Sequence, residues 1–153
     1  MSKFVTSFWN YVPSGVIDAE KSVDDWAELG MNLPMTCYCE KDEDYEYILK
    51  NLDAAAKKGM KLIICDKRTL WYEIGTIGED EYRRRVKAAA DKFALHPAFF
   101  AFHVGDEPAK EHWADMLKAV KIVKEYARPF INFLPFFDED FEKTLGTNHA
   151  GYA

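Results

Sequence analysis

Short apolar runs alternate with amphipathic helical stretches along the 153-residue chain. In the helical stretches, apolar residues recur every three or four positions, as with Ile48, Leu52 and Ala55. The run at 61–66 is almost continuously apolar, which is typical of a strand buried on both faces of a parallel sheet. The pattern predicts four helices and five strands. The helices are expected at 22–29, 43–58, 79–95 and 110–126, and the strands at 4–11, 32–39, 61–66, 98–104 and 129–134.

This alternation predicts an α/β fold with right-handed crossovers and parallel strands. An open doubly wound sheet usually has a glycine-rich turn after its first strand. Residues 9–15 read Trp-Asn-Tyr-Val-Pro-Ser-Gly and offer no such phosphate cradle. A complete (β/α)₈ barrel typically takes about 250 residues. We therefore expect residues 1–153 to form one domain, the N-terminal portion of a partial (β/α)₈ (TIM) barrel. A flavodoxin-like five-strand domain is the alternative.

Composition and charge exclude several classes of function. Hydrophobic residues make up 48% of the chain and charged residues 30%, which favours a packed core over disorder. The net charge is −6, and the basic run 83–85 lies within a helical pattern, so we expect no nucleic-acid binding. No apolar stretch reaches the roughly 20 residues of a membrane span. The N-terminus lacks a signal-peptide core, so we expect a cytoplasmic protein, or an exported one if a signal peptide has been removed.

The three cysteines, Cys37, Cys39 and Cys65, show no disulfide-framework spacing. We interpret them as buried reduced thiols rather than as a three-thiolate metal site. The sequence therefore predicts no metal site. It also carries no nucleotide or flavin motif, so we expect no organic cofactor.

Polar and aromatic residues gather where the predicted parallel strands end, the edge at which such folds place their functional groups. Hydroxyl groups of a sugar need hydrogen bonds, and its apolar face stacks on aromatic rings, so this combination favours a carbohydrate partner. The candidate substrate-binding residues are Trp9, Asn10, Tyr38, Asp66, Trp71, His103, Asp106 and Asn132.

The segment Gly-Asp-Glu-Pro at 105–108 is the sharpest of these features. Burial and a neighbouring like charge raise the pKa of a carboxyl group, and a raised pKa suits a general acid near neutrality. In the alternative interpretation, Asp106 and Glu107 simply open the following helix, where acidic residues are favoured.

Residues 96–108 (His-Pro-Ala-Phe-Phe-Ala-Phe-His-Val-Gly-Asp-Glu-Pro) resemble the fourth-strand segment of glycoside hydrolases of the β-galactosidase-like barrel clan. They are similar, more narrowly, to uncharacterised bacterial barrel proteins that carry Asp-Glu-Pro at this point. Residues 27–32, 130–135 and 145–147 resemble other short segments of that group.

The resemblance implies a retaining glycosidase in which Glu107 is the general acid/base. Asp106 stands where the clan commonly has an Asn that donates to the sugar 2-hydroxyl, and an ionised Asp can only accept. The clan's nucleophile is a second Glu after the seventh strand, and no residue of this chain matches it. We therefore expect a glycan-directed segment with little activity as an isolated chain, unless Asp66 or Asp138 acts as an in-chain partner. A non-catalytic carbohydrate-binding half-barrel is the alternative.

A half-barrel also leaves sheet edges unpaired. Such edges invite pairing with another chain, so we expect a homo-oligomer.

Overall fold

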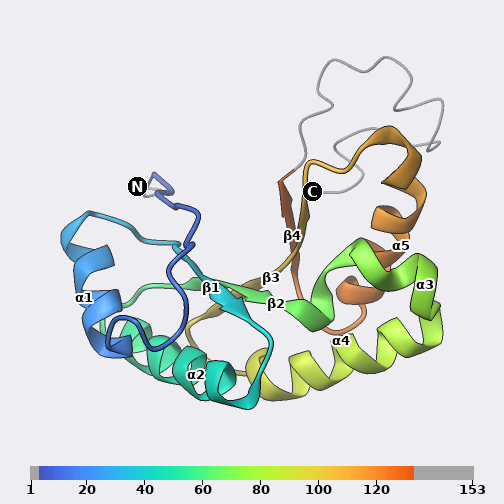
Figure 1. Cartoon of the computed structure of the whole chain (residues 1–153). Helices are drawn as coiled ribbons and strands as arrows, with labels where there is room; N and C mark the ends of the chain where they lie inside the picture. The colour runs from blue at the N-terminus through green and yellow to red at the C-terminus, as the bar shows by residue number, and fades with distance from the viewer. Residues whose placement is uncertain (1–3, 133–153) are drawn as a thin grey trace.

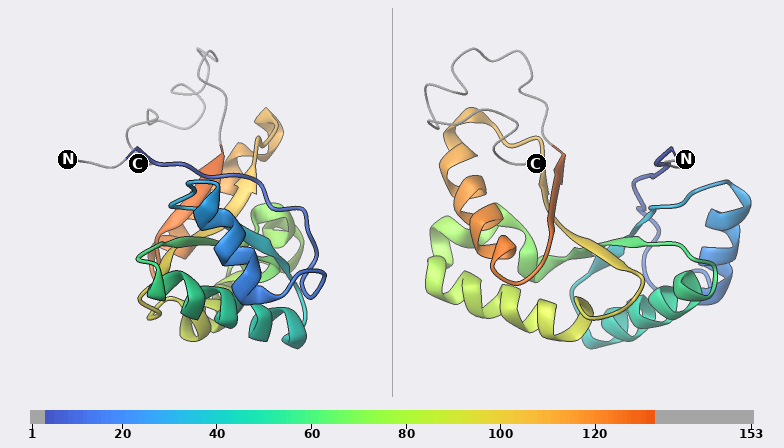
Figure 2. Two further views of the ribbon diagram at one scale, coloured as in Figure 1. Left: turned by 90° about the vertical axis from the view of Figure 1, so that its left-hand side faces the viewer. Right: turned by 180° about the vertical axis from the view of Figure 1, so that it is seen from behind.

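The computed structural model describes residues 4–132 and contains a four-stranded parallel sheet with the order β1-β2-β3-β4. The strands are β1 (Met35–Cys39), β2 (Leu62–Asp66), β3 (Phe99–Asp106) and β4 (Pro129–Asn132). The α-helices are α1 (Ala19–Glu28), α2 (Asp42–Lys57), α3 (Ile74–Ile77), α4 (Glu79–Phe93) and α5 (Trp113–Lys124). Three short 3₁₀ turns are η1 (Lys67–Thr69), η2 (Trp71–Glu73) and η3 (Lys110–His112). Helices α2, α4 and α5 pack along one side of the curved sheet (Figures 1 and 2).

Apolar side chains are buried on both faces of the sheet. The larger cluster lies beneath the helices and includes Leu62, Ile64 and Phe102. A smaller cluster on the opposite, concave face contains Leu33, Met35 and Ile63, with Cys65, Phe100 and Phe130 packed against it. Successive side chains of a strand point to opposite faces, so a strand covered on both sides is apolar at every position. This explains the almost unbroken apolar run of β2.

The predicted strand at 4–11 is wrong: this segment is extended but does not join the sheet. Its main-chain contact with the next segment is concentrated at Thr6, whose carbonyl accepts hydrogen bonds from the amides of Asn32 (3.2 Å) and Leu33 (3.1 Å). Pro34 follows and has no N–H to donate, so the ladder cannot continue toward β1. The described sheet therefore has four strands rather than five.

Other boundaries differ by a few residues. Helix α1 begins three residues earlier than expected because the Asp18 carboxylate caps it, accepting from the amides of Glu20 and Lys21 (both 3.0 Å). Strand β3 runs on to Asp106, and α5 begins at Trp113 because 110–112 form η3. Helix α3 and turns η1 and η2 lie in a connection for which the pattern predicts no element. Residues 133 and 134 of the expected fifth strand, Asp138 and the 145–147 motif lie outside the described residues.

The three cysteines are free thiols: Cys37 and Cys39 are buried, and Cys65 is half-buried. Burial raises the pKa of Cys37 to about 11 and that of Cys65 to about 12, which keeps both thiols protonated near neutrality. Within residues 4–132, no helix has the length and apolar character needed to cross a membrane.

Candidate functional site

Asp106 and Asn132 lie side by side at the carboxyl ends of β3 and β4, where the strand register pairs them. The side-chain amide of Asn132 donates a 2.9 Å hydrogen bond to Asp106 Oδ1. The main-chain carbonyl of Asn132 accepts from the amide of Glu107, also at 2.9 Å. One residue of β4 thus positions both acidic residues of the Asp-Glu-Pro motif, and both carboxylates remain exposed.

The backbone of the 105–108 turn is constrained from several sides. Glu107 has a φ of 33°, the one positive φ among the described non-glycine residues, a conformation that costs free energy for an L-residue. Gly105, with φ of 153°, lies so close to the indole of Trp71 that a β-carbon there would be 2.2 Å from Trp71 Cδ1. The indole N–H of Trp113 donates to the carbonyl of Pro108 at 3.0 Å. Strained residues of this kind cluster at functional sites, which makes Glu107 a candidate catalytic group.

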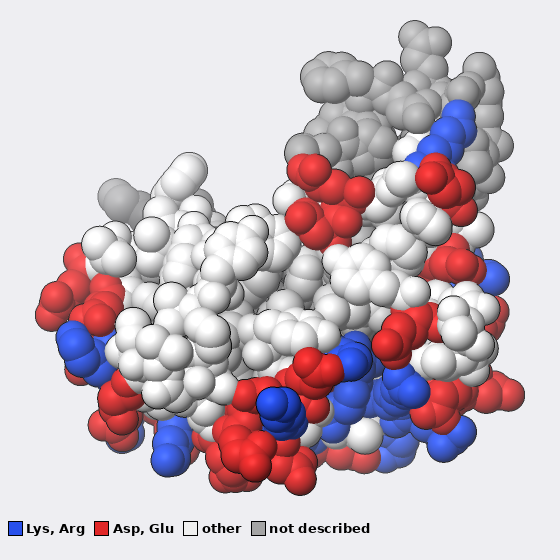
Figure 3. All heavy atoms as spheres, viewed as in Figure 1, with Lys and Arg blue, Asp and Glu red and all other residues white. Residues whose placement is uncertain are grey.

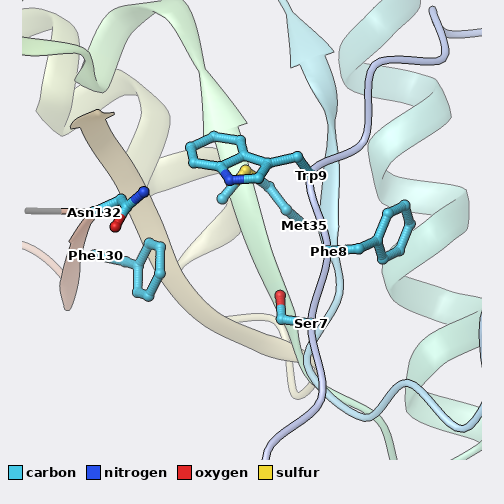
Figure 4. Close-up of a pocket in the computed structure, with 6 residues that line it drawn as sticks. All are labelled: Ser7, Phe8, Trp9, Met35, Phe130 and Asn132. Carbon is cyan, nitrogen blue, oxygen red and sulfur yellow. The ribbon is translucent and has the colours of Figure 1, made fainter. Parts of the chain in front are cut away.

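A cavity of about 240 Å³ opens on the concave face beside this turn. Its lining comes from the N-terminal segment, β1 and β4: Ser7, Phe8, Trp9, Met35, Phe130 and Asn132. Figure 4 shows the indole of Trp9 reaching over Met35, with Phe130 and Asn132 approaching from β4. We call this space the concave-face cavity. Asn132 connects it to the acidic turn through its hydrogen bond to Asp106.

His103 of β3 lies between two of the residues that line the concave-face cavity. Its ring is edge-on to Trp9, with centroids 5.1 Å apart, and 6.3 Å from the ring of Phe130. The residue is only 3% exposed, and its Nδ1 has no hydrogen-bond partner among the described residues. Burial lowers the pKa of His103 to about 4, outweighing the opposing effect of the Asp106 charge. The imidazole is therefore neutral near pH 7, with one nitrogen to donate and one to accept.

The aromatic residues differ in what they present to solvent. Trp9 is 37% exposed and Tyr38 is 43% exposed, so both offer ring surface to a ligand. Burial, followed by the charge of Glu40, raises the pKa of Tyr38 to about 12, so its phenol stays protonated. Trp71 is buried and packs against Tyr72, with ring centroids 4.7 Å apart, so it supports the acidic turn rather than forming an open platform.

Two of the predicted site residues are directed elsewhere. Asn10 lines a separate groove with Trp26 and Tyr47 on the far side of the N-terminal segment. Asp66 is fully buried, and its carboxylate accepts hydrogen bonds from the Arg68 amide (2.9 Å) and from Arg68 Nη2 (2.6 Å). Because Arg68 occupies this carboxylate, Asp66 has an internal structural partner and does not face the concave-face cavity.

The structure therefore brings together Trp9, His103, Asp106, Glu107 and Asn132, with Tyr38 on the same edge. Sequence reasoning missed Met35 and Phe130, which line the cavity. Side chains that alternate along a strand point to opposite faces of the sheet, and this alternation could have placed Met35 and Phe130 on the concave face. The alternation does not show which face is which, because the strands carry apolar residues on both faces. Among residues 4–132, no three His, Cys, Asp or Glu side chains are grouped so as to hold a metal ion.

No protein-family model matches the sequence, and none of the curated proteins matches it. Several solved structures resemble the chain, and two of them are compared with it below. A plant beta-glucan endohydrolase matches with a TM-score of 0.52 at 13% identity, over 84% of this chain and 40% of that one. The endoglucanase Cel5A of Pseudomonas stutzeri matches with a TM-score of 0.54 at 18% identity, over 73% and 42%. The chain thus spans about two-fifths of the length of these neighbours.

At these identities the likeness establishes the fold. The chain has the architecture of part of a (β/α)₈ barrel of the kind found in glycoside hydrolases. This confirms the predicted partial barrel over the flavodoxin-like alternative. The narrower resemblance to the β-galactosidase-like clan stays a prediction.

Proposed function

We propose that the chain is the acid/base-bearing part of a retaining glycoside hydrolase that acts on a glycan, with Glu107 as the general acid/base. The observation that carries the proposal is the position of Glu107. Glu107 is held in a strained backbone conformation at the carboxyl edge of the strands. Its main-chain amide donates a hydrogen bond to the carbonyl of Asn132, which lines the aromatic concave-face cavity. Functional groups of (β/α)₈ barrels lie at this edge.

In the proposed reaction, the Glu107 carboxyl group gives its proton to the glycosidic oxygen as the bond from that oxygen to C1 breaks. A carboxylate nucleophile bonds to C1 on the opposite side of the sugar and forms a glycosyl ester. The Glu107 carboxylate then takes a proton from a water molecule that displaces the ester. The nucleophile should lie about 5–5.5 Å from Glu107 in a retaining enzyme. We assign it to no described residue, since the chain covers only about two-fifths of its structural neighbours.

The remaining site residues have binding roles in this proposal. Trp9 supplies a ring on which the apolar face of a sugar stacks, and Asn132 and His103 supply hydrogen bonds to hydroxyl groups. The names of the two neighbours, a beta-glucan endohydrolase and an endoglucanase, favour β-linked glucans as the first substrates to test.

The proposal can be tested by supplying azide as an external nucleophile. Azide attacks C1 of an aryl β-glycoside, and the departing aryl oxygen receives its proton from Glu107, yielding a glycosyl azide and the phenol. Methylumbelliferyl cellobioside requires this proton, whereas dinitrophenyl cellobioside has a leaving group that needs none. We expect azide-dependent release of methylumbelliferone, and we expect Glu107→Gln to reduce it by a factor of about 10²–10⁴.

Two controls distinguish the loss of proton donation by Glu107 from a loss of folding or of substrate binding. Azide-dependent release of dinitrophenol should survive in Glu107→Gln, because that step needs no acid. Glu28→Gln, which changes an exposed carboxylate on α1, should match the wild-type chain with both substrates. Equal methylumbelliferone release by the wild-type and Glu107→Gln chains would contradict the assignment. Saturable glycan binding with no release from either substrate would instead establish the non-catalytic carbohydrate-binding half-barrel.

A further inference from the structure

We infer that the concave-face cavity and the adjoining acidic turn select a glycan that carries protonated amino groups, such as an oligosaccharide of glucosamine. This inference rests on the proposed function, since it assumes that the ligand is a glycan, and it names the class of glycan.

Hydrogen-bond acceptors are in excess beside the concave-face cavity, at the turn that Asn132 connects to it. Asp106 and Glu107 are both exposed there, and an ionised carboxylate accepts hydrogen bonds but cannot donate them. Asn132 satisfies one oxygen of Asp106 at 2.9 Å. Acidic side chains gather where β3 and β4 end, beside an uncharged surface (Figure 3).

Three basic side chains of the loops and helix near the acidic turn form ion pairs with other acidic residues. Lys67 pairs with Glu40, and Arg68 pairs with the buried Asp66. Arg85 pairs with Glu73 and with Glu81. None of these three cations pairs with Asp106 or Glu107, so they leave the charge of both carboxylates to a cationic ligand.

A buried polar group near this turn has no hydrogen-bond partner among the described residues. His103 is only 3% exposed, its Nδ1 has no partner among the described residues, and its ring contacts both Trp9 and Phe130 of the cavity wall. A buried polar atom without a partner costs free energy, so a ligand that bonds to it gains affinity. Because burial keeps this imidazole neutral, it brings no positive charge that would repel an amino group.

An amino sugar complements this arrangement better than other sugars. Its ammonium group carries three donors, and charge-assisted hydrogen bonds to carboxylates are stronger than those of a neutral hydroxyl. The electron-rich face of Trp9 also attracts a cation. A uronic acid would instead meet Asp106 and Glu107 with like charge. The volume of about 240 Å³ lies below the roughly 300–1,000 Å³ of pockets for drug-sized ligands and suits a single sugar ring.

Isothermal titration at pH 6 with three trisaccharides tests the inference: glucosamine trimer, its N-acetylated form and cellotriose. They differ at the 2-position, which carries an ammonium, an amide or a hydroxyl. We expect glucosamine trimer to bind at least about tenfold more tightly than cellotriose. Asp106→Asn keeps the size of the side chain and an acceptor for Asn132 but removes the charge. It should reduce the difference to less than about threefold by weakening the binding of glucosamine trimer.

Glu111→Gln is the matched control, because it removes an exposed carboxylate from η3 without touching the turn. It should preserve the preference for glucosamine trimer. The wild-type chain provides a measurement that does not depend on any variant folding: rising salt should weaken binding of glucosamine trimer more than that of cellotriose.

The outcomes separate this inference from the proposed function. If cellotriose and glucosamine trimer bind equally well and salt affects neither, the amino-sugar inference is wrong and glycan binding stands. If none of the three trisaccharides binds and azide supports no turnover, the proposed function itself fails.

Discussion

The indole of Trp71 fills the space that a β-carbon on Gly105 would occupy, with only 2.2 Å separating that position from Trp71 Cδ1. Gly105 immediately precedes the two acidic residues of the site, so this contact fixes where β3 ends and where the carboxylates begin. The absence of a side chain at Gly105 is thus a requirement of packing.

Gly105→Ala should lower the free energy of unfolding by about 2–4 kcal/mol, because it combines overpacking against Trp71 with a φ of 153° that favours glycine. Gly30→Ala is the matched control: Gly30 has a φ of 77°, but nothing lies within 4 Å of its added β-carbon. It should cost only about 1–2 kcal/mol. Urea denaturation measures both. Equal losses would show that Trp71 does not restrict position 105.

Asn132→Asp should place a second carboxylate against Asp106, where the two like charges repel each other. We expect a loss of about 1 kcal/mol in unfolding free energy at pH 7, shrinking in high salt, which screens the repulsion. Asn132→Ala removes the hydrogen bond without adding charge, so its loss at pH 7 should be smaller. Equal unfolding free energies for Asn132→Asp and Asn132→Ala at pH 7 would contradict charge repulsion between position 132 and Asp106.

The pH dependence of stability should report the environment of His103. Its pKa in the folded chain, about 4, lies below the ordinary 6.5, so the unfolded chain binds this proton more readily. His103 should therefore make the folded state less stable as the pH falls from about 6.5 to about 4, by at most about 1.4 kcal/mol per pH unit. His103→Gln should remove this contribution. A pH series of urea denaturations that gives the same slope for both chains would contradict the burial argument.

Self-association remains a prediction. Strand β4 pairs with β3 and has no other strand beside it among the described residues. Because an unpaired edge can add a strand from another chain, light scattering should give about twice the monomer mass of 17.7 kDa. Chains that pair through edges and apolar surface should stay associated in high salt. A single species of monomer mass at every concentration would contradict the prediction.

The apolar pattern of the sequence correctly predicts the position of the two central strands, which are buried on both faces. Strands β2 and β3 have apolar residues at nearly every position, and both lie within two residues of the expected bounds. The N-terminal segment is predicted wrongly because its apolar and aromatic residues resemble those of a strand, although Pro34 limits its pairing. The periodicity of apolar side chains does not show whether the backbone of a neighbouring segment has an N–H group to donate to a sheet hydrogen bond.

The candidate site is predictable in part for a similar reason. Parallel strands bring Asp106 and Asn132 together, although 26 positions separate them in the sequence, and the register makes them partners. Asp66 also ends a strand, yet its side chain turns away to Arg68. Strand order therefore places residues at an edge, whereas local hydrogen bonds decide which side chains face a ligand.

The attachment of the N-terminal segment has a consequence for recognition. Among the described residues, this segment is tied to the rest of the molecule by hydrogen bonds of Phe4, Thr6 and Ser14. Trp9 lies between these anchors and contacts the sheet through its ring. One wall of the concave-face cavity therefore belongs to a segment that no strand pairing holds, whereas Phe130 and Asn132 in another wall belong to β4 of the sheet. A ligand that contacts Trp9 and Asn132 together would add a further link between the N-terminal segment and the sheet.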